Sequence, residues 1–65
     1  MAVGRRIRGL RKESGVSQAT IAEAAGLSRP FYGAIENGRR NVSLDNLFAI
    51  ADALGVDVGA FFRNP

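Results

Sequence analysis

Apolar residues recur among polar ones in short segments of the chain, each with the spacing of an amphipathic helix. The first predicted helix covers residues 3–14, where Val3, Ile7 and Leu10 form one apolar stripe. The fourth has the widest apolar face, made of Leu44, Leu47, Phe48, Ile50, Ala51 and Leu54. The β-branched residues never alternate over four or more positions as they would in a strand. The pattern therefore predicts an all-α fold of five short helices.

Serine and glycine residues mark where these helices begin and end. A serine hydroxyl just before a helix accepts a hydrogen bond from an unpaired backbone N–H, and this role is predicted for Ser17, Ser28 and Ser43. Glycine takes the positive φ that ends a helix, and this role is predicted for Gly15, Gly26, Gly38 and Gly55. The predicted helices are about 3–14, 18–25, 29–37 and 44–54, followed by a short turn over 58–62 that Asp57 would cap.

Length and composition limit what so small a chain can do. Its 65 residues allow one domain, residues 1–65, and it contains neither Cys nor His. Disulfides, ordinary zinc sites, thiol chemistry and a Ser-His-Asp triad are thereby excluded. The six carboxylates show no paired arrangement and no Gly-rich phosphate loop is present. We expect a binding protein, with no catalytic residues, no metal and no cofactor.

Basic residues outnumber acidic residues by nine to six, which gives a formal charge of +3. Eight of the nine are arginine, the residue that suits bidentate contacts with phosphate and guanine, although a GC-rich genome would also enrich arginine. The charge is concentrated in the first half of the chain. No apolar run approaches the ~20 residues that cross a bilayer, so we expect a cytoplasmic protein with no membrane partner.

The most informative stretch is residues 17–37. Two short predicted helices are joined there by a tight turn centred on Gly26 and Leu27, which is the spacing of a helix-turn-helix. Ala22 is small enough to let the second helix cross closely over the first. A generic helical hairpin is the structural alternative.

The residues of this stretch resemble a known family. Ser17-Gln18-x-x-Ile21-Ala22-x-x-Ala25-Gly26-Leu27-Ser28, followed by residues 35–44, is similar to the lambda and 434 repressor and Cro group. Within that group, the loop Gly-Arg-Arg-Asn-Val-Ser-Leu is most similar to restriction–modification controller proteins. The resemblance implies a transcriptional regulator that binds double-stranded DNA as a homodimer on a pseudo-palindromic operator. It would place the recognition helix, residues 28–37, in the major groove.

The resemblance also implies a role for individual residues. Arg29 would pair with guanine, and Phe31 and Ala34 would at most pack on thymine methyl groups, with core packing or a partner contact as alternatives for Phe31. The positions facing base edges would be Ser28, Arg29, Pro30, Phe31 and Ala34. Phosphate contacts are implied for Gln18, Asn37, Arg39, Arg40, Asn41 and, after its capping role, Ser43. Few side chains would then read bases directly, so DNA shape and deformability would carry more of the specificity.

Two further assignments concern structure and assembly. The resemblance implies an ion pair between Arg11 and Glu36 that holds the first helix to the end of the third. It also implies a dimer contact over residues 56–62, which include Val56, Val58, Phe61 and Phe62. One phenylalanine is expected in the dimer contact and the other in the core of the protomer.

Two other functions stay open from the sequence. One is a protein-interaction module of the antitoxin or adaptor type, built on the same fold. The other is a membrane-surface peptide built on the basic first helix, which its narrow apolar stripe disfavours. Arg5, Arg6 and Arg8 on that helix are expected to form a solvated face.

Overall fold

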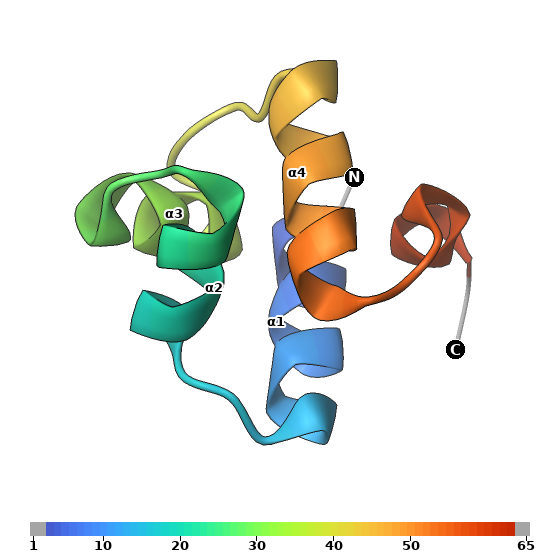
Figure 1. Ribbon diagram of the computed structural model, residues 1–65. Coiled ribbons are helices and arrows are strands. Elements are labelled where there is room, and N and C mark those ends of the chain that lie inside the picture. The colour runs from blue at the N-terminus through green and yellow to red at the C-terminus, as the bar shows by residue number, and fades with distance from the viewer. Residues whose placement is uncertain (1–2, 64–65) are drawn as a thin grey trace.

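A computed structural model describes residues 3–63 of the chain, and all regular structure in this range is helical. The helices are α1 (Val3–Ser14), α2 (Gln18–Ala25), α3 (Arg29–Glu36) and α4 (Leu44–Leu54) (Figure 1). The fifth predicted helix is a single short 3-10 helix, η1 (Val58–Phe62). The third helix ends at Glu36, with Asn37 as its C-cap, one residue earlier than predicted. Within residues 3–63, none of these helices is long and apolar enough to pass through a bilayer.

The three serine caps are present. The Oγ atoms of Ser17, Ser28 and Ser43 accept hydrogen bonds at 3.1–3.2 Å from backbone N–H groups three residues further on. The predicted cap at Asp57 is wrong, because its side chain makes no capping hydrogen bond. The Asp57 carboxylate instead lies 3.6 Å from Nη2 of Arg63, and both side chains are exposed.

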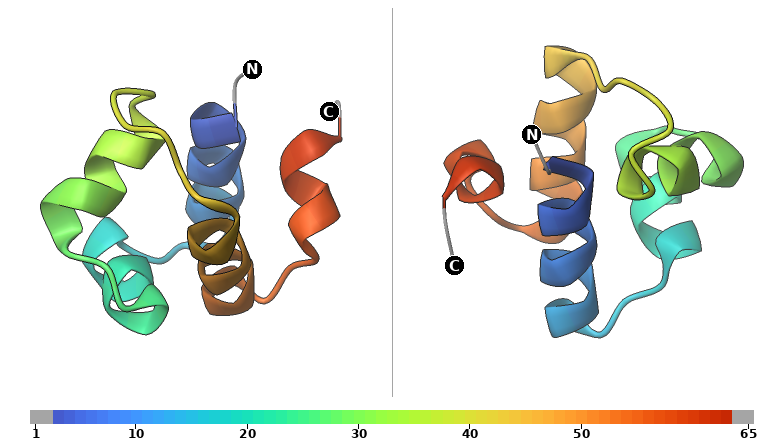
Figure 2. Two further views of the ribbon diagram at one scale, coloured as in Figure 1. Left: turned by 90° about the horizontal axis from the view of Figure 1, so that it is seen from above. Right: turned by 180° about the vertical axis from the view of Figure 1, so that it is seen from behind.

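Helices α1 and α4 lie side by side at the centre of the molecule. Helices α2 and α3 pack on one side of this pair, and η1 packs on the other side against both (Figures 1 and 2). The core between the layers has Ile7, Tyr32, Ile35 and Ile50 as its largest fully buried side chains. It therefore draws on α1, α3 and α4, with Ile21 and Ala22 of α2 completing it.

The apolar face of α4 is wider than the core that covers it. Leu47, Ile50 and Ala51 are buried, as the spacing predicts, but Leu44 is 63% exposed and Phe48 is 50% exposed. Leu44 and Phe48 therefore belong to the predicted apolar face of the helix but not to the core. They lie four residues apart on the same side of the helix, and no element within residues 3–63 covers that side.

Helix α1 touches the end of α3 at the level of the backbone. A Cβ atom placed on Gly4 would lie 2.1 Å from the carbonyl oxygen of Ile35 and 3.1 Å from that of Glu36. Only a residue without a side chain fits between two main chains at this distance. Gly4 therefore sets how closely α1 approaches the third helix, and with it the position of the candidate site described below.

Candidate nucleic-acid interface

Helices α2 and α3 are joined by a left-handed turn at Gly26, which has φ of 74°. The N–H of Leu27 donates to the carbonyl of Ala22 at 2.8 Å, which closes the end of α2 before the chain turns into α3. Ala22 is 2% exposed, since α3 and α4 both pack against its helix. The predicted pair of short helices joined by a tight turn at Gly26 is confirmed, and this arrangement is that of a helix-turn-helix.

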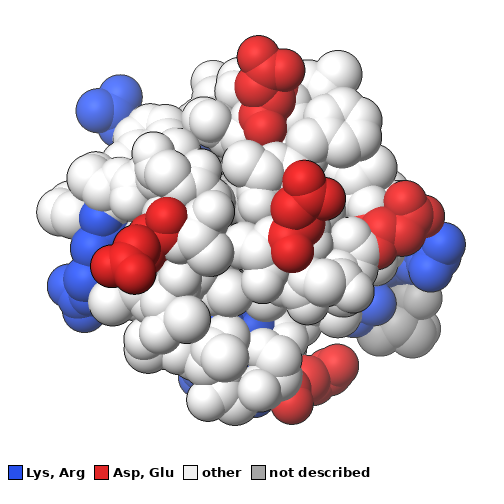
Figure 3. Space-filling model, viewed as in Figure 1, with Lys and Arg blue, Asp and Glu red and all other residues white. Residues whose placement is uncertain are grey.

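The exposed charges differ in sign between segments of the chain. Every exposed charged side chain from Ser28 to Ser43 is an arginine: Arg29, Arg39 and Arg40. Glu36 is the acidic residue of that stretch and is buried. Helices α2 and α4 contain Glu23, Asp45 and Asp52 but no basic residue. Figure 3 shows acidic side chains spread over the face that α2 and α4 present, with basic side chains at its margins.

The first turn of α3 is open to solvent. Ser28, Arg29 and Pro30 are exposed, whereas Phe31 and Ala34 are half-buried. Phe31 packs against the core cluster and also keeps part of its ring accessible. Core packing and a surface role are therefore combined in this one side chain.

The loop that follows α3 is also open to solvent along most of its length. The residues assigned there to phosphate contacts are all exposed: Asn37, Arg39, Arg40, Asn41 and Ser43. Arg40 differs from the others, because its guanidinium carbon lies 5.8 Å from the ring centre of Phe31. The hydrophobic and polar pattern does not predict this contact, which the fold makes between residues nine positions apart.

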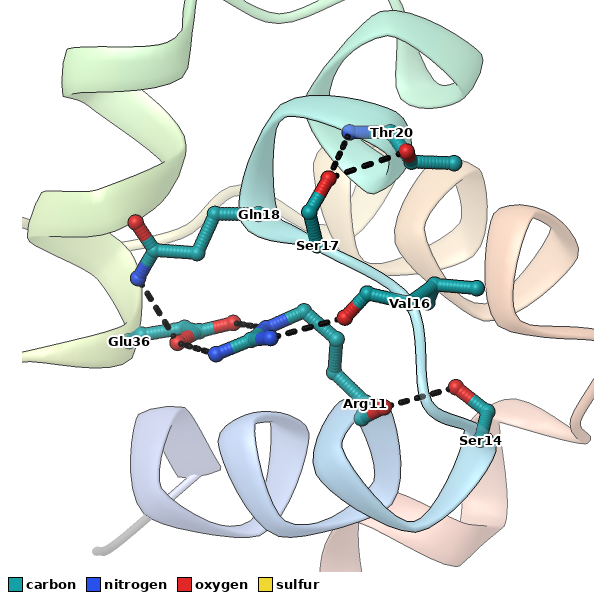
Figure 4. A network of polar contacts seen from close by, with 7 residues as sticks. All are labelled: Arg11, Ser14, Val16, Ser17, Gln18, Thr20 and Glu36. Carbon is teal, nitrogen blue, oxygen red and sulfur yellow. Dashed lines mark hydrogen bonds and ion pairs between the residues drawn. The ribbon is translucent and has the colours of Figure 1, made fainter.

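A buried polar cluster lies behind α3 (Figure 4). Nε of Arg11 donates to Oε2 of Glu36 at 2.6 Å and Nη2 donates to Oε1 at 3.1 Å, which makes a bidentate pair. Nη1 of Arg11 donates to the carbonyl of Val16 at 2.9 Å. The Glu36 carboxylate is fully buried and the Arg11 side chain is 11% exposed. The pair thus joins α1, the α1–α2 connection and the end of α3, as the resemblance implied.

The cluster shifts the proton affinity of its members. Burial alone would raise the pKa of Glu36, but the hydrogen bonds from Arg11 and Gln18 outweigh it and lower that pKa. The hydrogen bond to Glu36 raises the pKa of Arg11. Burial also raises the pKa of Tyr32, whose hydroxyl lies in the field of both charges. Within residues 3–63 that hydroxyl has no hydrogen-bond partner, so the ion pair rather than Tyr32 holds the cluster together.

Gln18 is engaged with the same cluster. Its Nε2 donates to Oε1 of Glu36 at 3.0 Å, and its side chain lies against Gly33, where an added Cβ would be 3.5 Å from Oε1 of Gln18. One of its two amide hydrogens is therefore used inside the protein. The other hydrogen and the first backbone N–H groups of α2 are the donors that this end of the helix still offers.

Other predicted residues are divided by the structure between core and surface. Phe61 is 3% exposed and is the phenylalanine that belongs to the core, so it leaves the set of dimer-contact candidates, whereas Phe62 is 49% exposed and stays in it. Val56 and Val58 are half-buried. Arg6, expected on a solvated face, donates from Nε to the carbonyl of Ala60 at 2.9 Å and so ties α1 to η1.

The fold and this arrangement define a helix-turn-helix domain. A family model described as helix-turn-helix matches residues 7–61, and the chain belongs to this family. It is 48% identical over 60 residues to the immunity repressor protein of Bacillus phage phi105, covering 92% of the chain and 42% of that protein's length. It is 43% identical to the control protein C.MunI of a Mycoplasma species, covering 94% of the chain and 84% of that protein.

A solved structure extends the likeness to three dimensions. The restriction-modification controller protein C.AhdI from Aeromonas hydrophila superimposes with a TM-score of 0.91 at 43% identity, covering 94% of this chain and 92% of that chain. The resemblance inferred from the sequence is thereby confirmed.

Proposed function

We propose that this protein is a transcriptional regulator that binds double-stranded DNA as a homodimer, with α3 in the major groove of a pseudo-palindromic operator. The observation that carries this proposal is the charge pattern of residues 28–43, whose exposed charges are all arginines. A phosphate backbone attracts such a surface. The acidic side chains on the face of α2 and α4 disfavour an orientation in which that face approaches the DNA.

The contacts divide into two kinds in this proposal. Arg29, at the exposed start of α3, pairs with O6 and N7 of a guanine. The other contacts are made to phosphates and fix the register of the protein on the duplex. They come from the start of α2 and from the loop after α3, and the residues are Gln18, Asn37, Arg39, Asn41 and Ser43. Base contacts specify a sequence, while phosphate contacts add affinity that falls with salt.

The homodimer is proposed to use the C-terminal part of the chain. Phe62 is exposed there, with Val56 and Val58 half-buried nearby in the sequence. An apolar aromatic side chain that is 49% exposed is a suitable centre for a two-fold contact. Two copies would then present their α3 helices to half-sites about 34 Å apart.

Selection of bound sites from a random duplex pool tests the proposal. The wild-type protein is expected to enrich a two-fold symmetric sequence, and its affinity for that sequence is expected to fall by about 10³ or more between 50 and 200 mM salt if six or more phosphates are contacted. Failure to enrich any sequence, together with salt-independent behaviour, would refute it and favour a protein-interaction module.

Two arginine variants separate reading from positioning. Arg29→Ala is expected to flatten discrimination between selected and scrambled duplexes. Arg39→Ala is expected to weaken binding to all duplexes about equally and to lower the salt slope by roughly one unit. Equal losses on every sequence for both variants would contradict the division of roles.

A further inference from the structure

Arg40 is exposed in the loop after α3, and its guanidinium lies over an aromatic ring of the recognition helix. Its guanidinium carbon is 5.8 Å from the ring centre of Phe31, within the range at which a cation is attracted to an aromatic face. Phe31 itself is fixed, since it packs against the core cluster. The end of a flexible side chain is therefore placed beside α3 before any ligand is bound.

Arg40 borders a hollow between the start of α1 and the loop, which Gly4, Ile35 and Val42 also line. The side chain thus extends from a loop at the C-terminal end of α3 back to a residue in its first turn. An arginine that contacts only a phosphate beside its own loop does not require a contact with the first turn of α3.

We propose that Phe31 and Arg40 act as one specificity-determining unit that reads a thymine and a guanine next to it in the major groove. This inference rests on the proposed function. The accessible part of the Phe31 ring offers an apolar surface that suits the C5 methyl group of thymine. The guanidinium of Arg40, held by the ring, donates two parallel hydrogen bonds to O6 and N7 of the adjacent guanine. Arg40 then reads bases, instead of belonging with the phosphate contacts to which the sequence analysis assigned it.

Single-atom changes in the DNA test the two halves of the unit. In the selected duplex, replacing the thymine of the step with uracil removes only the methyl group, and wild-type affinity is expected to fall about threefold. Replacing the guanine with 7-deazaguanine removes one acceptor and is expected to cost about tenfold. Phe31→Ala should be insensitive to the first change and Arg40→Ala to the second.

The coupling between the two residues is tested with Phe31→Leu, which keeps an apolar side chain against the core but removes the aromatic face. This variant is expected to keep its melting temperature within a few degrees, yet to lose much of the preference for guanine that Arg40 supplies. Arg39→Ala is the matched control, since it removes a neighbouring exposed arginine and should leave both base preferences intact.

The outcomes separate this inference from the proposed function. If the wild type enriches a site but Arg40→Ala weakens all duplexes equally, Arg40 is a phosphate contact and the inference is overturned. It is also overturned if Phe31→Leu leaves the guanine preference unchanged. If the wild type enriches no site at all, the proposed function itself fails.

Discussion

The same substitution at two places in α1 is expected to change stability in opposite directions. Gly4 and Gly9 both lie inside the helix, where alanine is favoured over glycine by about 1 kcal/mol. An added Cβ at Gly9 meets no atom within 4 Å, so Gly9→Ala should realise this gain. An added Cβ at Gly4 would lie 2.1 Å from the Ile35 carbonyl oxygen, which is well inside van der Waals contact.

The magnitude at Gly4 follows from what would have to move. Both obstructing atoms are backbone carbonyl oxygens, at the end of a helix that is also held by the buried Arg11–Glu36 pair. Side-chain rotation cannot relieve the overlap, so α1 must move away from α3. Overpacking costs about 1–3 kcal/mol, and a clash between main chains belongs near the upper limit. After the gain in helix propensity, the expected net loss is about 1–2 kcal/mol.

Thermal unfolding followed by circular dichroism measures both effects. For a domain of this size 1 kcal/mol shifts the melting temperature by about 4–8 °C, so Gly9→Ala should raise it by that amount and Gly4→Ala should lower it by at least as much. Guanidinium titrations of the same variants give the free energies of unfolding. A Gly4→Ala protein as stable as Gly9→Ala would refute the close approach of α1 and α3.

Two further predictions concern the buried ion pair and the two phenylalanines near the C-terminus. Because the pKa of Glu36 is lowered in the folded state, its contribution to stability is present above its unfolded pKa of about 4.3 and is lost as the pH falls below that value. Glu36→Gln should therefore lose the acid-sensitive part of the stability and be less stable by about 3–5 kcal/mol at neutral pH. An acid titration of this variant identical to that of the wild type would contradict the assignment. Phe61→Ala should lower the free energy of unfolding by about 3–5 kcal/mol because the Phe61 ring is buried in the core. Phe62→Ala should change the stability of the monomer by no more than about 0.5 kcal/mol, but should shift a dimer toward monomer in sedimentation. The reverse pattern would show that the two roles are exchanged.

Local features of the fold are predictable from the sequence because short-range chemistry decides them. A serine hydroxyl before a helical segment, or a glycine after it, acts within three or four residues, so Ser17, Ser28, Ser43 and Gly26 behave as their types predict. The helix-turn-helix follows from the same local signals combined with a small residue at the crossing. This is why four of the five predicted elements have the observed bounds and the remaining one, the third helix, was predicted one residue too long.

Features that depend on distant partners were not accessible from the pattern. The spacing of Leu44 and Phe48 is that of core residues, but their exposure depends on whether another element covers that side of α4, which spacing alone does not show. The Phe31–Arg40 contact and the Gln18–Glu36 hydrogen bond likewise join residues that only the fold brings together. For the candidate site, the resemblance therefore predicted the Arg11–Glu36 pair, but the sequence did not predict the contacts of Arg40 with Phe31 and of Gln18 with Glu36.

The position of Glu36 explains how a chain with a formal charge of only +3 presents a uniformly basic surface. An exposed glutamate at the end of α3 would add a negative charge to the stretch that contains Arg29, Arg39 and Arg40 and would repel an approaching phosphate. Burial against Arg11 removes that negative charge from the surface and uses an arginine from a different helix to balance it. The pair thus holds α1 to α3 and leaves the three exposed arginines without an acidic neighbour from residues 28–43. Segregation of charge, more than its total, is what this fold contributes to the proposed DNA-binding surface.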